Sequence, residues 1–95
     1  MTTSETKAVH AFVRGRVQGV GFRQSTKIMA RSLGLSGWVR NTGPGTVEVW
    51  AQGPSDSVSR MIDWLWLGPS GSAVIGVESD VVAPDALLQD FLIRQ

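Results

Sequence analysis

Residues 9–33, VHAFVRGRVQGVGFRQSTKIMARSL, change their hydrophobic period once, and this change decides the fold. The first part is apolar at every second position, which predicts a strand that ends at Gly15: Val9, Ala11 and Val13. From Phe22 onward, apolar and small residues recur at helical spacing instead: Thr26, Met29, Ala30 and Leu33. Gly34 follows, at a place where helices commonly end. The stretch therefore predicts a strand, a glycine-bearing loop and a helix.

The same kind of pattern continues through the rest of the chain. Further strands are predicted before and after a turn at residues 42–45, and again near the C-terminus: 38–41, 47–52, 74–82 and 91–94. A second helix is expected after residues 53–56, which place a proline and an acid near its N-terminus, and residues 68–69 end it. The order βαββαβ, with a short closing strand, is typical of the ferredoxin-like, split βαβ arrangement. We expect an α+β fold with an antiparallel sheet and both helices on one face.

Length and composition indicate a single globular domain. The chain has 95 residues, enough for one hydrophobic core and too few for two. Hydrophobic residues make up 42% and charged residues 18%, values typical of a globular protein. The polar N-terminus predicts a flexible tail over residues 1–7, so the domain is expected over residues 8–95.

Composition also excludes several kinds of chemistry. The chain has no cysteine, which excludes disulfides, a thiol nucleophile and cysteine-ligated metals. It has one histidine, His10, which would have to serve alone as a base. A histidine-rich metal cluster is therefore excluded as well.

Charge and hydropathy argue against two classes of partner. Nine basic and eight acidic residues give a net charge of +1, and the basic residues are scattered, unlike those of strong nucleic-acid binders. No apolar run approaches the ~18 residues that span a bilayer. Residues 1–6 lack the apolar region of a secretory signal. We expect a cytoplasmic protein with neither a nucleic acid nor a membrane as partner.

The loop between the first strand and the first helix has the features of an anion site. It reads Gly-Arg-Val-Gln-Gly-Val-Gly-Phe-Arg over residues 15–23. Its glycines permit a positive φ and let successive N–H groups face an anion, while the helix adds its positive dipole end. Arg23 opposes that dipole, so an anion explains it better than helix stability does. Glycine spacing alone leaves a second interpretation open, namely a tight turn with an exposed arginine.

The residues of this loop resemble the signature of the acylphosphatase family. The likeness continues through residues 33–41, Leu-Gly-Leu-Ser-Gly-Trp-Val-Arg-Asn, which are similar to the second signature of that family. Three weaker matches follow in order: Gly45-x-Val47-Glu48, Trp64-Leu65 before Gly68-Pro69, and Phe91-x-Ile93-Arg94. The resemblance covers about residues 8–94.

This resemblance implies an enzyme that hydrolyses acyl phosphates to a carboxylate and inorganic phosphate. It implies that backbone amides of the loop bind the phosphoryl oxygens: Val17, Gln18, Gly19, Val20 and Gly21. The essential arginine of the family corresponds to Arg23, and its water-positioning asparagine corresponds to Asn41. It further implies no metal, no cofactor and a monomer whose one partner is a small-molecule acyl phosphate.

Three other polar residues are expected to lie on the surface without a catalytic or binding role. Arg16 occupies a variable position of the signature and is expected to be solvated. Arg40 alternates to the face opposite Asn41 and is expected to pair on the surface. His10 is expected on the surface, since no acidic partner is suggested for it.

The four tryptophans are expected to pack rather than to bind a ligand. Trp38 belongs to the second signature and is expected to pack. Trp64 and Trp66 flank the stripe of the second helix and are expected to complete the core or cover its edge. Trp50 is expected on the open face of the sheet, with no role assigned.

Two positions depart from the family pattern. Gln24 and Gln95 stand where relatives often have other residues, and they bear on substrate preference.

Two other functions stay open. An RNA-recognition module shares the element order, but its central strands carry stacking aromatics that are few in this chain. The other rival is a small-molecule regulatory domain, or a stand-alone version of the acylphosphatase-like domain that begins larger carbamoyl-transfer maturation proteins. The short chain favours the free enzyme.

Overall fold

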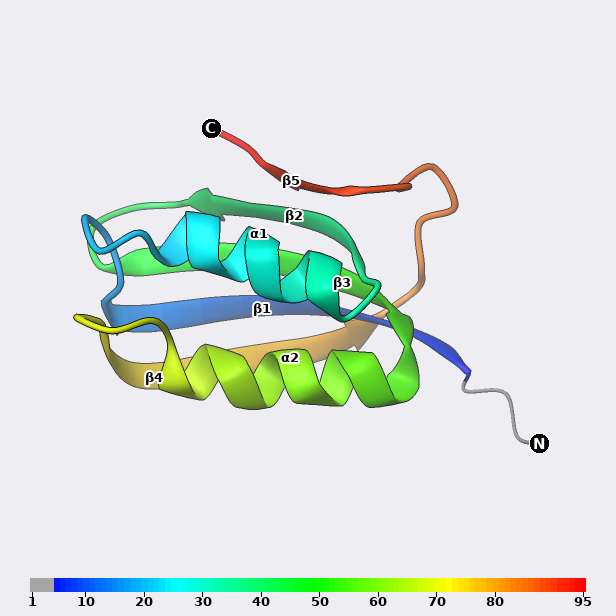
Figure 1. Cartoon of the computed structure of the whole chain (residues 1–95), viewed down its shortest axis with the longest axis horizontal. Coiled ribbons are helices and arrows are strands. Elements are labelled where there is room, and N and C mark those ends of the chain that lie inside the picture. The colour runs from blue at the N-terminus through cyan, green and yellow to red at the C-terminus, as the bar shows by residue number, and fades with distance from the viewer. Residues whose placement is uncertain (1–4) are drawn as a thin grey trace.

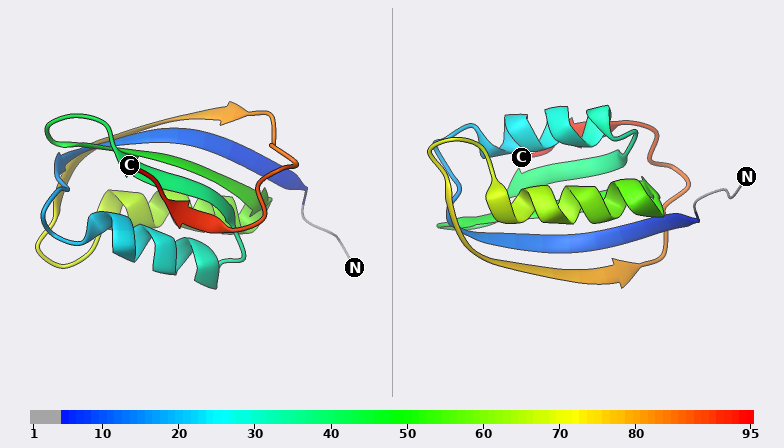
Figure 2. Two further views of the ribbon diagram at one scale, coloured as in Figure 1. Left: turned by 90° about the horizontal axis from the view of Figure 1, so that it is seen from above. Right: turned by 60° about the horizontal axis from the view of Figure 1, so that its bottom comes forward.

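The sheet of this protein has five strands in the order β4-β1-β3-β2-β5. The computed structural model describes residues 5–95, and both helices cover the same face of the sheet (Figure 1 and Figure 2). The elements follow in chain order: β1 Thr6–Arg16, α1 Phe22–Ser32, β2 Ser36–Asn41, β3 Thr46–Pro54, α2 Ser55–Leu67, β4 Ala73–Val82 and β5 Phe91–Ile93. The ferredoxin-like α+β fold expected from the sequence is therefore confirmed.

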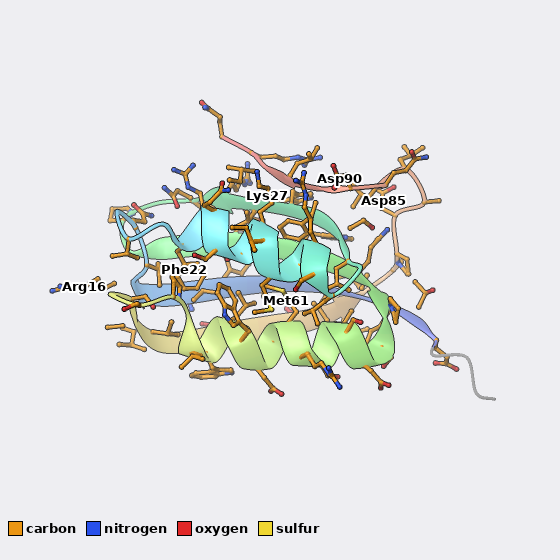
Figure 3. All side chains as sticks on the ribbon, in the orientation of Figure 1. Arg16, Phe22, Lys27, Met61, Asp85 and Asp90 are labelled. Atoms are coloured by element: carbon orange, nitrogen blue, oxygen red, sulfur yellow. The ribbon has the colours of Figure 1, made fainter. Side chains whose placement is uncertain are left out.

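The core lies between the sheet and the two helices. Alternate residues of β1 and β3 point into it and are completely buried, among them Ala11, Val13 and Val49. Phe22 of α1 and Met61 of α2 close it from the helix side (Figure 3). The two hydrophobic periods read from the sequence thus describe the two sides of one core.

The first strand begins earlier than expected. Thr6 and Lys7, assigned to a tail by the sequence, belong to β1 and pair with Pro54 and Gly53 of β3. Their polar character reflects exposure at the end of a sheet, not absence of structure. Glu5 precedes β1, and the remaining residues of the expected tail, 1–4, lie outside the described residues.

One strand departs from the expected antiparallel pattern. β5 pairs with β2 in parallel, with Phe91 opposite Gly37 and Ile93 opposite Val39. The reason is topological, since residues 83–90 cross from β4, at one edge of the sheet, to the opposite edge. The chain enters β5 from the end of the sheet where β2 also begins, and both strands run the same way (Figure 1).

The first helix ends with a Schellman motif. Gly34 has φ +73°, and its N–H donates to the carbonyl of Arg31 at 3.1 Å. The next N–H, from Leu35, reaches the carbonyl of Ala30 at 2.9 Å. These bonds satisfy the last carbonyls of the helix, as expected for a glycine at this position.

The tryptophans of α2 do not share one role. Trp64 is half-buried, and its ring centroid lies 5.6 Å from that of Phe22 in the core. Trp66 is 53% exposed, so the expectation that it covers the core is wrong. It follows Leu65, which is fully buried, and a helical step of one residue turns a side chain about 100° away from the core.

Within residues 5–95, neither helix combines the length and the apolar character needed to cross a membrane.

The open face of the sheet carries a charged cluster that corrects the expectation for His10. The Nε2 atom of His10 lies 2.5 Å from Glu48 Oε2, so this histidine has an acidic partner. Arg40 pairs as expected, and its Nε donates to Glu48 Oε1 at 2.6 Å. Burial alone would raise the pKa of Glu48, but the hydrogen bonds and charges of Arg40 and His10 lower that pKa below its ordinary value.

Two tryptophans lie beside this cluster. Trp50 occupies the open face, as expected, and it stacks on Trp38 with ring centroids 6.5 Å apart. Arg40 and Arg94 place their guanidinium groups 5.5 and 5.0 Å from the Trp38 ring centroid. The pair therefore covers part of the open face beside the charged cluster.

Candidate active site

The loop of the candidate site starts at an irregularity in the sheet. The pairing of β1 with β4 shifts register between Arg14 and Gly15, and Gly15 has φ +133°. A Cβ atom on Gly15 would lie 2.1 Å from the carbonyl oxygen of Ala73. Only glycine fits this close approach of two backbones near the end of β1.

The loop then turns into α1 without a side-chain cap. Gly19 and Gly21 have φ +75° and +74°, and neither is crowded, so the backbone conformation itself favours glycine there. Gly21 is the N-cap residue, no side chain caps the helix, and its first turn contains no acid. The first N–H groups of α1 are thus left for another acceptor, and an anion is suited to that place.

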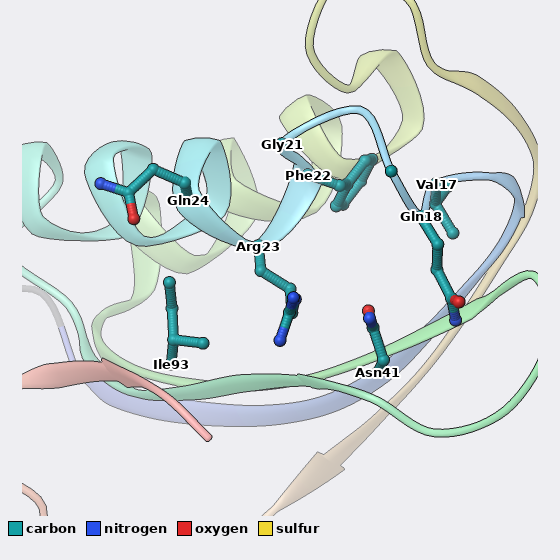
Figure 4. Close-up of a pocket in the computed structure, with 9 residues that line it drawn as sticks. Val17, Gln18, Gly21, Phe22, Arg23, Gln24, Asn41 and Ile93 are labelled. Carbon is teal, nitrogen blue, oxygen red and sulfur yellow. The ribbon is translucent and has the colours of Figure 1, made fainter. Parts of the chain in front are cut away.

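The loop, the start of α1 and the end of β2 enclose one pocket of about 300 Å³ (Figure 4). Arg23 reaches it from α1 and Asn41 from β2, and their side chains approach each other across it. The residues that line the pocket come from three segments and the last strand: Val17, Gln18, Gly19, Gly21, Phe22, Arg23, Gln24, Asn41 and Ile93. Residues 18 positions apart in sequence, Arg23 and Asn41, are thus brought together.

The pocket has the electrostatic character of an anion site. Arg23 is the one charged residue among those that line it, and no carboxylate lines it. Within residues 5–95, the Arg23 guanidinium has no carboxylate partner, whereas Arg14, Arg31 and Arg40 each have one. The unpaired guanidinium and the uncapped helix end together provide positive potential on one side of the pocket.

Most residues singled out in the sequence line this pocket. Val20 is the exception, because its side chain packs partly buried against the core, and only its backbone belongs to the loop. Arg16 is exposed and lies outside the pocket, as expected. Sequence reasoning missed Ile93, which reaches the pocket because β5 pairs beside β2. The signal available was its place in the weak C-terminal motif.

The described residues offer no evident metal-binding cluster. Among residues 5–95, no group of three or more histidine, aspartate or glutamate side chains is placed to hold a metal ion. The pocket itself is lined by backbone groups, amides, apolar side chains and Arg23. These groups suit a tetrahedral oxyanion better than a divalent cation.

Fold and pocket together define a small ferredoxin-like domain with one cationic, glycine-rich site. Comparison with known proteins gives the family. Residues 9–93 match the family model described as Acylphosphatase. The chain is 47% identical over 87 residues to an acylphosphatase from Pseudomonas paraeruginosa, an alignment that covers 92% of this chain and 94% of that protein.

Solved structures agree with the sequence comparison. An acylphosphatase from Coxiella burnetii superposes with a TM-score of 0.91 at 38% identity, covering 99% of this chain and 100% of that one. An acylphosphatase from Bacillus subtilis gives 0.89 at 30% identity, covering 94% and 99%. The chain belongs to the acylphosphatase family, and the enzyme class expected from the sequence is confirmed.

Proposed function

We propose that this protein hydrolyses the carboxyl-phosphate bond of acyl phosphates, with each part of the pocket in a defined role. The backbone amides of residues 17–21 and the Arg23 guanidinium hold the phosphoryl group, and Asn41 orients the attacking water. The observation that carries the proposal is the convergence of an unpaired Arg23 and Asn41 on one glycine-rich pocket at a helix N-terminus.

The phosphoryl group is held by charge and by directed hydrogen bonds. A guanidinium can donate to two phosphoryl oxygens at once, which a lysine cannot do in the same planar geometry. The amides of the loop and of the uncapped helix add donors that are fixed in place before the substrate binds. Together they stabilise the negative charge that spreads over the equatorial oxygens in the transition state.

The water attacks phosphorus opposite the acyl oxygen. The P–O bond to the acyl group breaks as the bond from water forms, and the acyl phosphate dianion plus water becomes a carboxylate plus dihydrogen phosphate. Both hydrogens of the water therefore stay on the phosphate product. The leaving group is the anion of an acid with a pKa near ~4, so it departs without a proton donor.

Asn41 suits the role of orienting this water. Its side-chain amide offers both a donor and an acceptor, and it stands across the pocket from Arg23. An amide is too weak a base to remove a proton, so its contribution is alignment. The proposed mechanism uses a small-molecule substrate, a single chain and no cofactor, because each role is filled by residues that belong to this pocket.

Release of phosphate from benzoyl phosphate by the purified protein tests the proposal. We expect turnover with benzoyl phosphate that is unchanged by EDTA. Carbamoyl phosphate is assayed in parallel, because preference for it would favour the chemistry of carbamoyl-transfer maturation proteins. Failure to hydrolyse benzoyl phosphate, or loss of activity in EDTA that a divalent ion restores, would overturn the proposed mechanism.

A further inference from the structure

The proposed function uses only the backbone amide of Gln18, which leaves its side chain unexplained. Any residue except proline supplies a backbone amide, so phosphate binding does not account for a glutamine here. The side chain reaches the turn at residues 42–45, between β2 and β3. Its Nε2 donates hydrogen bonds to the carbonyl oxygens of Gly43 and Thr46, the latter at 3.0 Å.

Both carbonyl oxygens also accept a bond within the turn. The Gly43 carbonyl accepts from the N–H of Thr46 at 3.3 Å, and the Thr46 carbonyl accepts from the N–H of Thr42 at 3.2 Å. A carbonyl oxygen has two lone pairs, and a primary amide has two N–H donors. Gln18 therefore completes the hydrogen bonding of both carbonyls, with one N–H available for each.

A backbone bond joins the same two segments at a second point. The N–H of Gly15, the next-to-last residue of β1, donates to the carbonyl of Gly45 at 3.1 Å. Asn41 is the last residue of β2 and comes immediately before the turn. Gln18 extends from the loop to the strand end beside Asn41 (Figure 4), so its bonds connect the two halves of the site.

We propose that the Gln18 side chain is a positioning residue, which holds Asn41 at a constant distance from the phosphoryl group in the loop. This inference rests on the proposed function. In this role the side chain acts through the turn and Asn41, not by direct contact with the phosphoryl group or the water. Its loss should displace the water that Asn41 orients while Arg23 and the loop amides continue to bind phosphate.

Gln18→Met tests this role, because methionine has a similar length and shape but lacks the donors. We expect kcat for benzoyl phosphate to fall about 10- to 100-fold, as for a reactant displaced by roughly an ångström. The inhibition constant for inorganic phosphate should change less than about threefold, since the ground-state contacts remain. Gln18→Glu should be at least as impaired, because a carboxylate accepts only and faces two carbonyl oxygens.

A double-mutant cycle separates positioning from a general structural role. With Asn41→Ala already present, Gln18→Met should lower kcat further by less than about threefold, because no oriented water is left to displace. Gln24→Met is the matched control, since Gln24 lines the same pocket but its amide has no carbonyl partner among residues 5–95. Whatever the size of the effect of Gln24→Met on kcat, that effect should multiply with the effect of Asn41→Ala.

Thermal unfolding of each variant shows whether it is folded at the assay temperature. Should Gln18→Met not fold, Gln18→Asn, too short to reach both carbonyls, replaces it with the same expected outcomes. If the wild-type enzyme is active and the folded Gln18 variant keeps full kcat, this inference alone is overturned. It is also overturned if the effect of the Gln18 substitution on kcat multiplies fully with the effect of Asn41→Ala. An inactive wild-type protein would overturn the proposed function, and this inference with it.

Discussion

Arg23 and Asn41 line one pocket from two different layers of the molecule, the first from the helix layer and the second from the end of a sheet strand. Arg23 belongs to the first turn of α1, and Asn41 is the last residue of β2. A ligand between them contacts a charged donor on one side and a neutral amide on the other. This asymmetry predicts different consequences for their removal.

Arg23→Gln should nearly abolish turnover and also weaken phosphate inhibition. In the proposed mechanism the guanidinium meets the phosphoryl oxygens in both the ground state and the transition state, and loss of a comparable transition-state arginine costs about 10³–10⁵-fold in rate. Steady-state kinetics with phosphate as inhibitor measures both effects. Arg16→Gln is the control, because Arg16 is an exposed arginine of the same loop outside the pocket. Equal losses in the two variants would refute a specific role for Arg23.

Asn41→Ala should lower kcat about 10²-fold or more while phosphate inhibition stays near the wild-type value. The reason is that Asn41 acts, in the proposed mechanism, on the water and not on the phosphoryl group. Because Asn41 precedes a turn, unfolding must be followed beside the kinetics. A folded variant that keeps full activity, or that loses phosphate affinity as severely as Arg23→Gln, would show that the assigned role is wrong.

Inorganic phosphate and sulfate should both inhibit competitively with respect to benzoyl phosphate. The N-terminus of α1 has no side-chain cap, and the phosphate site that we propose there should accept a tetrahedral oxyanion of either kind. Initial rates at several inhibitor concentrations distinguish the patterns. Noncompetitive inhibition, or no inhibition at tens of millimolar, would place the substrate elsewhere.

Glu48→Gln should lower the free energy of unfolding near neutral pH by about 1–3 kcal/mol, the range for a buried group that loses charged partners. The pKa of Glu48 is lowered in the folded state, so its stabilisation is present above the ordinary glutamate pKa and is lost as the pH falls through the folded value. Denaturation at pH 7 and pH 3 checks the sign, and the difference between variant and wild type should shrink at the lower pH.

The matched control for this prediction is Glu78→Gln. Glu78 lies on β4, which β1 separates from β3, and it pairs with Arg14, but both side chains are largely exposed. Its replacement should change the free energy of unfolding by less than about 0.5 kcal/mol. A pH-independent loss for Glu48→Gln, equal to that of the control, would contradict the importance of the buried carboxylate.

Gly37→Ala should destabilise the protein more than Gly43→Ala does. The two glycines have nearly the same φ, +143° and +142°, so the backbone strain of an alanine is matched. A Cβ on Gly37 would lie 1.8 Å from the carbonyl oxygen of Trp50, whereas the space beside Gly43 is open. The extra loss should be about 1–3 kcal/mol, the usual cost of overpacking. Chemical denaturation measures it, and equal losses would mean that β2 can shift away from β3.

The sequence by itself determined the local elements of this protein. Each pattern reflects the backbone conformation and burial of residues close together in the chain. The patterns are the alternation in residues 9–15, the helical stripe from Phe22 and the glycine at position 34. Such short-range preferences act in any context that buries one face, and both helices and all five strands were predicted. The signature around Gly19 and Arg23 likewise sufficed to indicate the family.

Tertiary structure decided every relationship that depends on strand register and on which strands are neighbours. His10 and Glu48 are 38 residues apart and form a pair only because β1 lies beside β3. Ile93 reaches the pocket because β5 pairs in parallel with β2, and Gln18 contacts the turn after Asn41 across 25 residues. These contacts arise when the whole sheet assembles around its core, and no short stretch of sequence encodes which distant strand becomes its neighbour.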